Sequence, residues 1–118
     1  MTPPNTLAMF QHLDWSSIPV ERVNEHITRQ IVHGERLMVC RLVLAAHTVT
    51  PVHTHLHEQI TIVERGRADF FVEDAKRTAS AGDVLLFPSN IRHGATMLDE
   101  EVVLIDIFSP PREDFLRK

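Results

Sequence analysis

The sequence predicts an all-β protein of a single domain, folded as a closed barrel or a double-sheet jelly roll. Helical periodicity is scarce, whereas turn residues recur about every ten to fifteen positions between short apolar runs, as is typical of many short strands. At 118 residues the chain can bury a hydrophobic core without disulfides, and it shows no internal repeat or second domain. About eight strands without helices must protect their sheet edges, and a barrel or a jelly roll does so.

The first half of the chain divides into an irregular beginning and three strands. Residues 1–25 contain early prolines and Ile18-Pro19, which favour an arm or a short edge strand. Residues 37–46 are apolar in both phases except at Arg41, which suits a strand covered on both sides or lying at a subunit contact. Strands follow at 59–65, closed by Gly66, and at 68–73.

Turn residues delimit the strands of the second half. Ala81-Gly82-Asp83 predicts a turn before a strand at 84–87, and Pro88-Ser-Asn90 predicts another before His93. The acidic residues 99–101 are expected to form a solvated hairpin turn. The last strand, 102–108, ends before Pro110-Pro111, which cannot donate to a ladder.

Composition narrows the possible partners and location. The net charge of -4, without clusters of Lys and Arg, argues against a nucleic-acid partner. No apolar stretch is long enough for a membrane span, and the N-terminus lacks the features of a signal peptide, so a cytoplasmic location is expected. The single cysteine, Cys40, lies among apolar residues and is expected to be buried.

The most informative segment is Pro51–Gln59, which contains three histidines at alternate positions. If it is a strand, His53, His55 and His57 share one face, and Gln59 keeps the same parity. Neutral imidazoles on one face can meet a single metal ion, and His93 could join them from another strand of a closed sheet. We therefore predict a metal site.

An alternative for the same segment is a solvated loop that happens to be rich in histidine. Spacing alone favours the metal site about twofold. Glu58 has the opposite parity and should point away, and His57 is expected beside the site or at its rim. The remaining histidines, at positions 12, 26, 33 and 47, are expected to be ordinary surface or hydrogen-bonded residues.

A second group of candidate residues lies at the end of the chain. Asp106 interrupts the apolar strand 102–108 and shares its phase with Phe108, so both can face one cavity. A carboxylate there is functional, or it has an ordinary structural role, either in an ion pair with Arg41 or Arg112 or at a strand end that is hydrated on one side. The residues alone favour neither interpretation. Arg112 follows a rigid Pro-Pro pair and could bind a carboxylate in bidentate fashion, although a solvated surface arginine is the commoner case. Phe108 alone would be assigned to the core.

Two segments together resemble the cupin motifs. His53-x-His55, followed by Gln59 and Gly66, is similar to the first motif, and Gly82, Pro88, Asn90 and His93 are similar to the second. The resemblance implies a cupin double-stranded β-helix, a jelly-roll barrel, at 26–110, with 1–25 as the arm and 111–118 as a C-terminal tail bordering the site.

The chain departs from the cupin pattern at two positions. His47 replaces a frequent Gly, and Gln59 replaces the usual Glu. A neutral amide oxygen leaves the ion with more net positive charge, which favours Lewis-acid chemistry over iron-dependent oxygen activation.

A closer resemblance is to the small cupins of pectin and alginate degradation, the KdgF type. It is carried by His55-Leu-His57-Glu-Gln59 and by Asp106-Ile-Phe108-Ser-Pro-Pro-Arg-Glu-Asp-Phe115, and it extends over nearly the whole chain. The resemblance implies conversion of 4,5-unsaturated monouronates into the open-chain 5-keto form. It also implies a homodimer and one divalent transition metal, which could be nickel, zinc, cobalt, manganese or iron. The implied metal ligands are His53, His55, Gln59 and His93, and the implied active-site residues are Asp106, Phe108 and Arg112.

Two other functions remain open at this point. One is a cupin dioxygenase, against which Gln59 speaks. The other is a cupin that binds a small ligand without turnover, because a fold does not fix a function.

Overall fold

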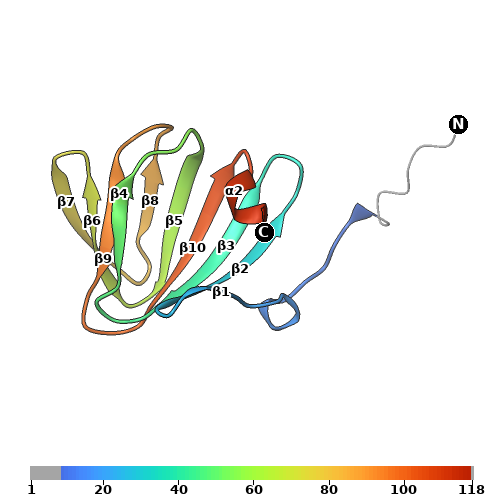
Figure 1. The fold of residues 1–118 in the computed structure, drawn as a ribbon, viewed down its shortest axis with the longest axis horizontal. Helices are drawn as coiled ribbons and strands as arrows, with labels where there is room; N and C mark the ends of the chain where they lie inside the picture. Colours follow the sequence, from blue (N-terminus) through green and yellow to red (C-terminus); the bar gives the residue numbers. More distant parts are fainter. Residues whose placement is uncertain (1–8, 118) are drawn as a thin grey trace, which may run out of the picture.

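The chain folds into two antiparallel β-sheets that face each other. The computed structural model describes residues 9–117, and Figure 1 shows them as a body of strands with a terminal arm. The elements in chain order are η1 (Trp15–Ser17), β1 (Glu21–Asn24), β2 (Ile27–His33), β3 (Met38–Leu44), β4 (Val49–His53), β5 (Glu58–Arg65), β6 (Arg67–Val72), β7 (Ala75–Ser80), β8 (Val84–Phe87), β9 (His93–Met97), β10 (Val102–Ser109) and α2 (Glu113–Leu116). The predicted all-β, single-domain fold is confirmed.

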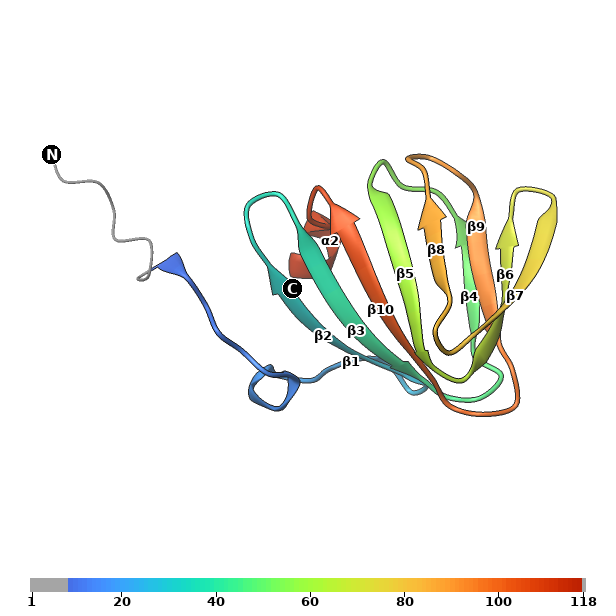
Figure 2. The ribbon, with the colours of Figure 1, turned by 180° about the vertical axis from the view of Figure 1, so that it is seen from behind.

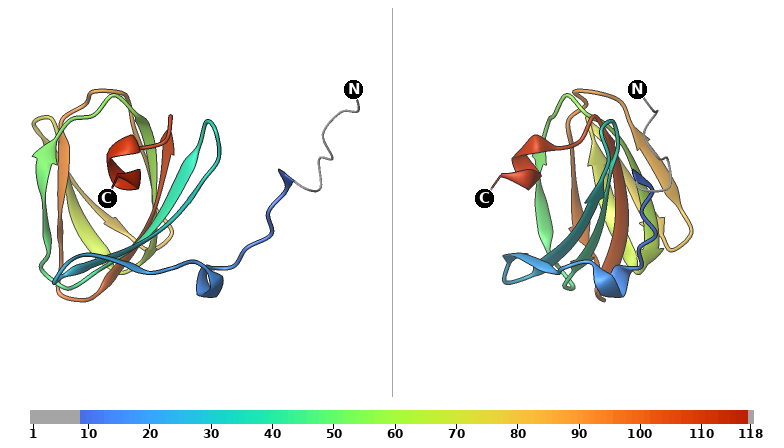
Figure 3. Two further views of the ribbon diagram at one scale, coloured as in Figure 1. Left: turned by 45° about the vertical axis from the view of Figure 1, so that its right-hand side comes forward. Right: turned by 90° about the vertical axis from the view of Figure 1, so that its right-hand side faces the viewer.

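The two sheets contain strands from distant parts of the chain. The larger sheet has the order β1-β2-β3-β10-β5-β8, and the smaller has the order β4-β9-β6-β7. Figure 2 shows both sheets from behind, and the turned views of Figure 3 show them curving around a common interior. Apolar side chains from both sheets fill this interior, among them Leu44, Val63, Phe70 and Met97.

Most of the strands expected from the sequence are present. The strand at 84–87 has the predicted bounds, and the strands predicted at 59–65 and 102–108 differ by only one residue. The expected count of about eight strands without helices was too low, because no strand was expected at 27–33 (β2) or 75–80 (β7), and it also omitted α2. The expected hairpin at 99–101 was wrong: this exposed segment crosses from β9 in the smaller sheet to β10 in the larger sheet.

The pairing of β5 with β10 sets the geometry of the interior. In this antiparallel pair Gln59 lies opposite Phe108, and Thr61 lies opposite Asp106. The turn from β5 into β6 needs Gly66, which has a φ of 83° and whose added Cβ would lie 2.6 Å from the carbonyl oxygen of Glu101. The polar residues of this strand pair, Gln59, Thr61 and Asp106, line the interior between the two sheets.

The ends of the described chain differ in their packing. Residues 9–14 extend away from the sheets, and Figure 1 shows this arm projecting from the body of strands. At the other end, the ring of Phe115 in α2 lies 5.7 Å from that of Phe108, so the C-terminal segment packs against the barrel. Among the described helices, none has the length and apolar character required to cross a bilayer.

Candidate metal centre

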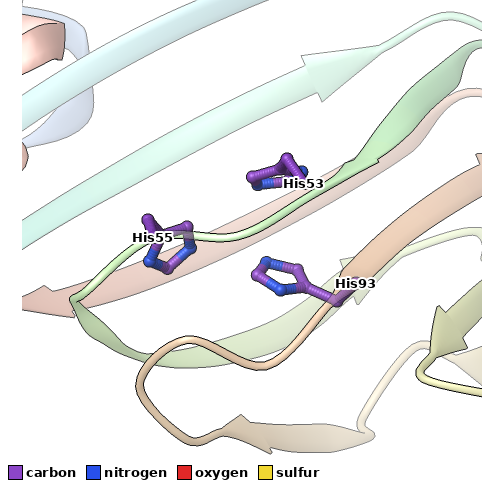
Figure 4. Close-up of side chains that lie close together, drawn as sticks. All are labelled: His53, His55 and His93. Atoms are coloured by element: carbon purple, nitrogen blue, oxygen red, sulfur yellow. The ribbon is translucent and has the colours of Figure 1, made fainter.

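Three histidines converge although they do not share a strand. His53 ends β4, His55 lies in the loop that follows, and His93 begins β9 opposite His53. One nitrogen from each ring lies within 4.8 Å of the other two, and Figure 4 shows the three rings grouped together. The expectation that His53, His55 and His57 lie on one strand face was wrong, because the chain leaves β4 at His53 and crosses to the larger sheet.

Backbone carbonyl groups fix the orientation of two of these rings. Nδ1 of His53 donates to the carbonyl oxygen of Pro51 at 2.9 Å, and Nδ1 of His93 donates to that of Ile91 at 3.0 Å. Both rings therefore keep the lone pair of Nε2 for another partner. In His93 that nitrogen is buried and has no hydrogen-bond partner among residues 9–117. A buried acceptor without a partner is costly unless a metal or another group binds it.

Gln59 provides an oxygen beside the three rings. Its side chain is buried, and Oε1 accepts a hydrogen bond from Nε2 of His55 at 3.0 Å. Its amide nitrogen donates away from the rings, to Oγ1 of Thr61 at 2.8 Å. The amide oxygen, and not the nitrogen, therefore faces the histidines.

Burial favours the neutral form of two of the imidazoles, those of His55 and His93. Burial, reinforced by the nearby guanidinium of Arg112, lowers the pKa of His55 to about 4. Burial also lowers the pKa of His93 below its ordinary value. Neutral imidazole is the form that binds metals, so the donor set of three ring nitrogens and one amide oxygen fits a divalent transition metal.

The other polar residues of the 51–59 segment lie outside this set. The ring of His57 is 5.3 Å from that of His55, and its Nδ1 is buried with no hydrogen-bond partner among the described residues. Glu58 is exposed, as its parity predicted. The histidines at positions 12, 26, 33 and 47 are exposed, as expected.

Asp106 faces the same interior from β10. Its Oδ1 accepts a hydrogen bond from the hydroxyl of Thr61 at 2.6 Å. Burial raises the pKa of Asp106 to about 6, although Thr61 and the charge of Arg112 act in the opposite direction. The alternative of an ion pair with Arg41 or Arg112 was wrong: Arg41 pairs with Glu64 at 3.3 Å, and Arg112 pairs with Asp114.

Arg112 is held in place and does not resemble a mobile surface arginine. Its Nε and Nη2 donate to the two carboxylate oxygens of Asp114 at 3.0 and 2.8 Å. The guanidinium lies over the rings of Phe115 and Phe108, at 4.2 and 5.2 Å from their centres. Only 11% of the Arg112 side chain is exposed. Its position at the edge of the interior agrees with the prediction from Pro110-Pro111.

One cavity of about 160 Å³ connects these groups. The polar residues that line it are Thr50, His53, Gln59, Thr61, His93, Asp106 and Arg112, and the aromatic ones include Phe108 and Phe115. Sequence reasoning missed Thr61 and Phe115. The parity of Thr61 with Gln59 could have identified the first, whereas Phe115 reaches the cavity only through the turn into α2.

A comparison with protein families identifies the fold. The family described as the cupin domain matches residues 40–108, which include all four candidate ligands. The chain belongs to the cupin family. The predicted jelly-roll barrel is thereby confirmed, and the two cupin motifs are the segments that bring His53, His55 and Gln59 together with His93.

Individual relatives extend the similarity beyond the cupin domain. This cupin is 36% identical over 100 residues to the pectin degradation protein KdgF of Dickeya dadantii, covering 83% of this chain and 91% of that protein. It superposes on KdgF from Halomonas sp. with a TM-score of 0.84 and 31% identity, over 89% of this chain and 99% of that one. An RmlC-like cupin from Shewanella frigidimarina gives a TM-score of 0.83 and 29% identity, over 90% and 96% of the two chains. The resemblance to the KdgF type is confirmed.

Proposed function

We propose that this cupin is a metal-dependent isomerase that converts 4,5-unsaturated monouronates, released by lyases from pectin or alginate, into open-chain 5-keto-4-deoxyuronates. The supporting observation is that His53, Gln59 and His93 line one cavity together with Asp106 and Arg112, and that the ring of His55 lies beside them, with one nitrogen within 4.8 Å of a ring nitrogen of His53 and of His93. The similarity to pectin degradation proteins named KdgF supports the substrate class.

Four residues would hold the metal: His53, His55, Gln59 and His93. Nickel, zinc, cobalt, manganese and iron all suit three imidazole nitrogens and one amide oxygen. When bound, the ion supplies a Lewis acid that polarises substrate oxygens and stabilises developing enolate charge. Because Gln59 is neutral, the donor set does not offset the charge of the ion.

The substrate is a masked enol, because its C4=C5 double bond carries the ring oxygen on C5. Breaking the C1–O5 bond gives the C1 aldehyde and a C5 enol, and protonation at C4 then gives the 5-ketone. The proton lost from the C1 hydroxyl is regained at carbon, so the reaction is an isomerisation without a co-reactant. The protein must therefore remove a proton from oxygen and deliver one to C4.

Asp106 is the residue that shuttles this proton. Thr61 binds Oδ1, which leaves Oδ2 for the substrate. Burial raises the pKa of the carboxyl to about 6, so near neutral pH the group is largely ionised but close to protonation. A pKa near the working pH gives the best compromise between accepting and donating a proton.

Arg112 binds the carboxylate of the uronate, and Phe108 forms an apolar wall beside it. The N–H of Nε and one N–H of Nη2 donate to Asp114, and the other three N–H groups of the guanidinium have no hydrogen-bond partner among residues 9–117, so they can bind a carboxylate in the cavity. The rings of Phe108 and Phe115 under the guanidinium keep it in one plane. This arrangement selects substrates that carry a planar carboxylate next to the reacting double bond.

The test is an ultraviolet assay on unsaturated galacturonate, whose absorbance disappears when the double bond is lost. The metal-loaded protein should accelerate this loss, and the Asp106→Ala variant and the chelator-treated protein should not. Protein that binds the uronate without turnover would contradict the proposal and favour a non-catalytic binding cupin. Oxygen uptake with added Fe²⁺ would favour a dioxygenase.

A further inference from the structure

Two hydrogen bonds join Gln59, a candidate metal ligand, to Asp106 through a buried hydroxyl. The Gln59 amide nitrogen donates to Oγ1 of Thr61 at 2.8 Å, and that hydroxyl donates to Oδ1 of Asp106 at 2.6 Å, while Oε1 of Gln59 lies 3.0 Å from Nε2 of His55. Thr61 and Gln59 are only 1% and 7% exposed. Water therefore has little access to the chain of bonds.

The direction of each bond follows from the number of hydrogens available. A carboxylate oxygen can only accept, so the single hydrogen of the Thr61 hydroxyl goes to Asp106. The hydroxyl oxygen can then only accept from Gln59, and the amide must turn its NH2 group toward it. The amide oxygen is left on the opposite side, toward His55.

We propose that Thr61 is a positioning residue of the metal centre, because its hydroxyl compels Gln59 to present oxygen and not nitrogen to the metal. The inference rests on the metal site of the proposed function but not on the uronate reaction. An amide nitrogen carries no lone pair suited to a divalent ion, so a flipped Gln59 would remove one of the four ligands.

The inference also changes how variants of Asp106 are to be interpreted. Without an acceptor at position 106, the Thr61 hydroxyl is free to turn and donate to Oε1 of Gln59. The amide oxygen would then be occupied on the side away from the histidines. A loss of activity in Asp106→Ala therefore has two causes, the missing proton shuttle and a weakened metal site, which a measurement of metal affinity separates.

The direct test is Zn²⁺ affinity, measured by competition with a chromophoric chelator on wild type, Thr61→Val and Thr61→Ser. Loss of a partner behind a metal ligand typically weakens binding about 10- to 100-fold, so Thr61→Val should bind Zn²⁺ at least about tenfold more weakly. Thr61→Ser keeps the hydroxyl and should retain the affinity. Thr78→Val is the matched control, since it removes a hydroxyl that donates to Asp69 at 2.6 Å on the exposed side of the smaller sheet.

A second variant at position 59 separates orientation from packing. In Gln59→Glu both terminal atoms are oxygens, so the metal meets oxygen whichever way the group turns. Thr61→Val should then change Zn²⁺ affinity less than about threefold in the Gln59→Glu background, against at least about tenfold in wild type. A purely structural role for Thr61 predicts the same loss in both backgrounds.

The remaining outcomes are also decisive. Unchanged Zn²⁺ affinity in Thr61→Val, or an equal loss in both backgrounds, would overturn the positioning role and leave the metal site intact. Wild-type protein that binds no Zn²⁺ would overturn the metal site and the positioning role together. If Thr61→Val does not fold, Asp106→Asn and Asp106→Ala replace it: both remove the same charge, but only Asn keeps an acceptor, so equal Zn²⁺ affinities would contradict the proposal.

Discussion

Replacing Asp106 by Asn should make the metal-free protein more stable at neutral pH. The carboxyl lies in the cavity wall, and its burial raises its pKa to about 6 from an ordinary value of 3.8. The folded chain therefore disfavours the ionised form, which the unfolded chain accepts readily. Asn keeps the shape and can still accept the Thr61 hydrogen bond through its amide oxygen, but it carries no charge.

The size of the effect follows from the two pKa values. A tenfold change in an equilibrium constant corresponds to about 1.4 kcal/mol, so a pKa raised from 3.8 to about 6 corresponds to about 3 kcal/mol. Between these pH values the folded protein binds more protons than the unfolded chain, so the contribution of Asp106 to stability falls as the pH rises. The full destabilisation is present above about pH 6 and absent below 3.8.

The assay is urea unfolding of both proteins after metal removal, at pH 7.5 and at the lowest pH at which both fold. We expect Asp106→Asn to exceed wild type by up to about 3 kcal/mol at pH 7.5 and the difference to shrink toward acid pH. Asp74→Asn, in the exposed turn between β6 and β7, removes the same charge and should change the stability by less than about 0.5 kcal/mol. Equal or lower stability of Asp106→Asn at pH 7.5 would refute the reasoning.

Three further predictions concern binding, backbone geometry and assembly. Arg112→Lys removes the two parallel hydrogen bonds that a guanidinium can make to the substrate carboxylate, so it should raise KM for the unsaturated uronate about tenfold with little change in kcat. An unchanged KM in steady-state kinetics would contradict this. Gly66→Ala should destabilise the fold more than Gly82→Ala in urea unfolding, since both glycines have positive φ but only the first places a Cβ 2.6 Å from the backbone of Glu101; equal losses would contradict the clash. The homodimer stays a prediction: sedimentation should give twice the chain mass of 13.5 kDa. A wild-type monomer would contradict it.

The bounds of a strand were predicted most accurately from the sequence where turn residues flank the strand on both sides. Gly82 and Pro88 enclose four residues of β8, and the predicted bounds were correct. β7 was missed because five of its six residues are exposed or half-buried and show no apolar alternation. It forms through its pairing with β6, a tertiary effect that local periodicity does not contain.

The candidate site shows the same division between local pattern and tertiary structure. Alternation along β10 correctly placed Asp106 and Phe108 toward one cavity. The grouping of His53 and His55 was predicted for the wrong reason, because the irregular pairing of β4 with β9 and the following loop bring the rings together. Whether the pKa of Asp106 is raised or lowered depends on its burial and on the positions of Thr61 and Arg112, and only the folded chain defines these.

The most direct test of the account is the metal content of the purified protein, measured by elemental analysis on wild type and His93→Ala. His93 comes from the second cupin motif, and its buried Nε2 faces the two histidines of the first. We predict close to one divalent transition metal per wild-type chain, a large loss in His93→Ala, and no loss in His26→Ala, which alters an exposed ring. Metal-free wild type that takes up no divalent ion on reconstitution, or His93→Ala that keeps a full complement, would contradict the proposed centre.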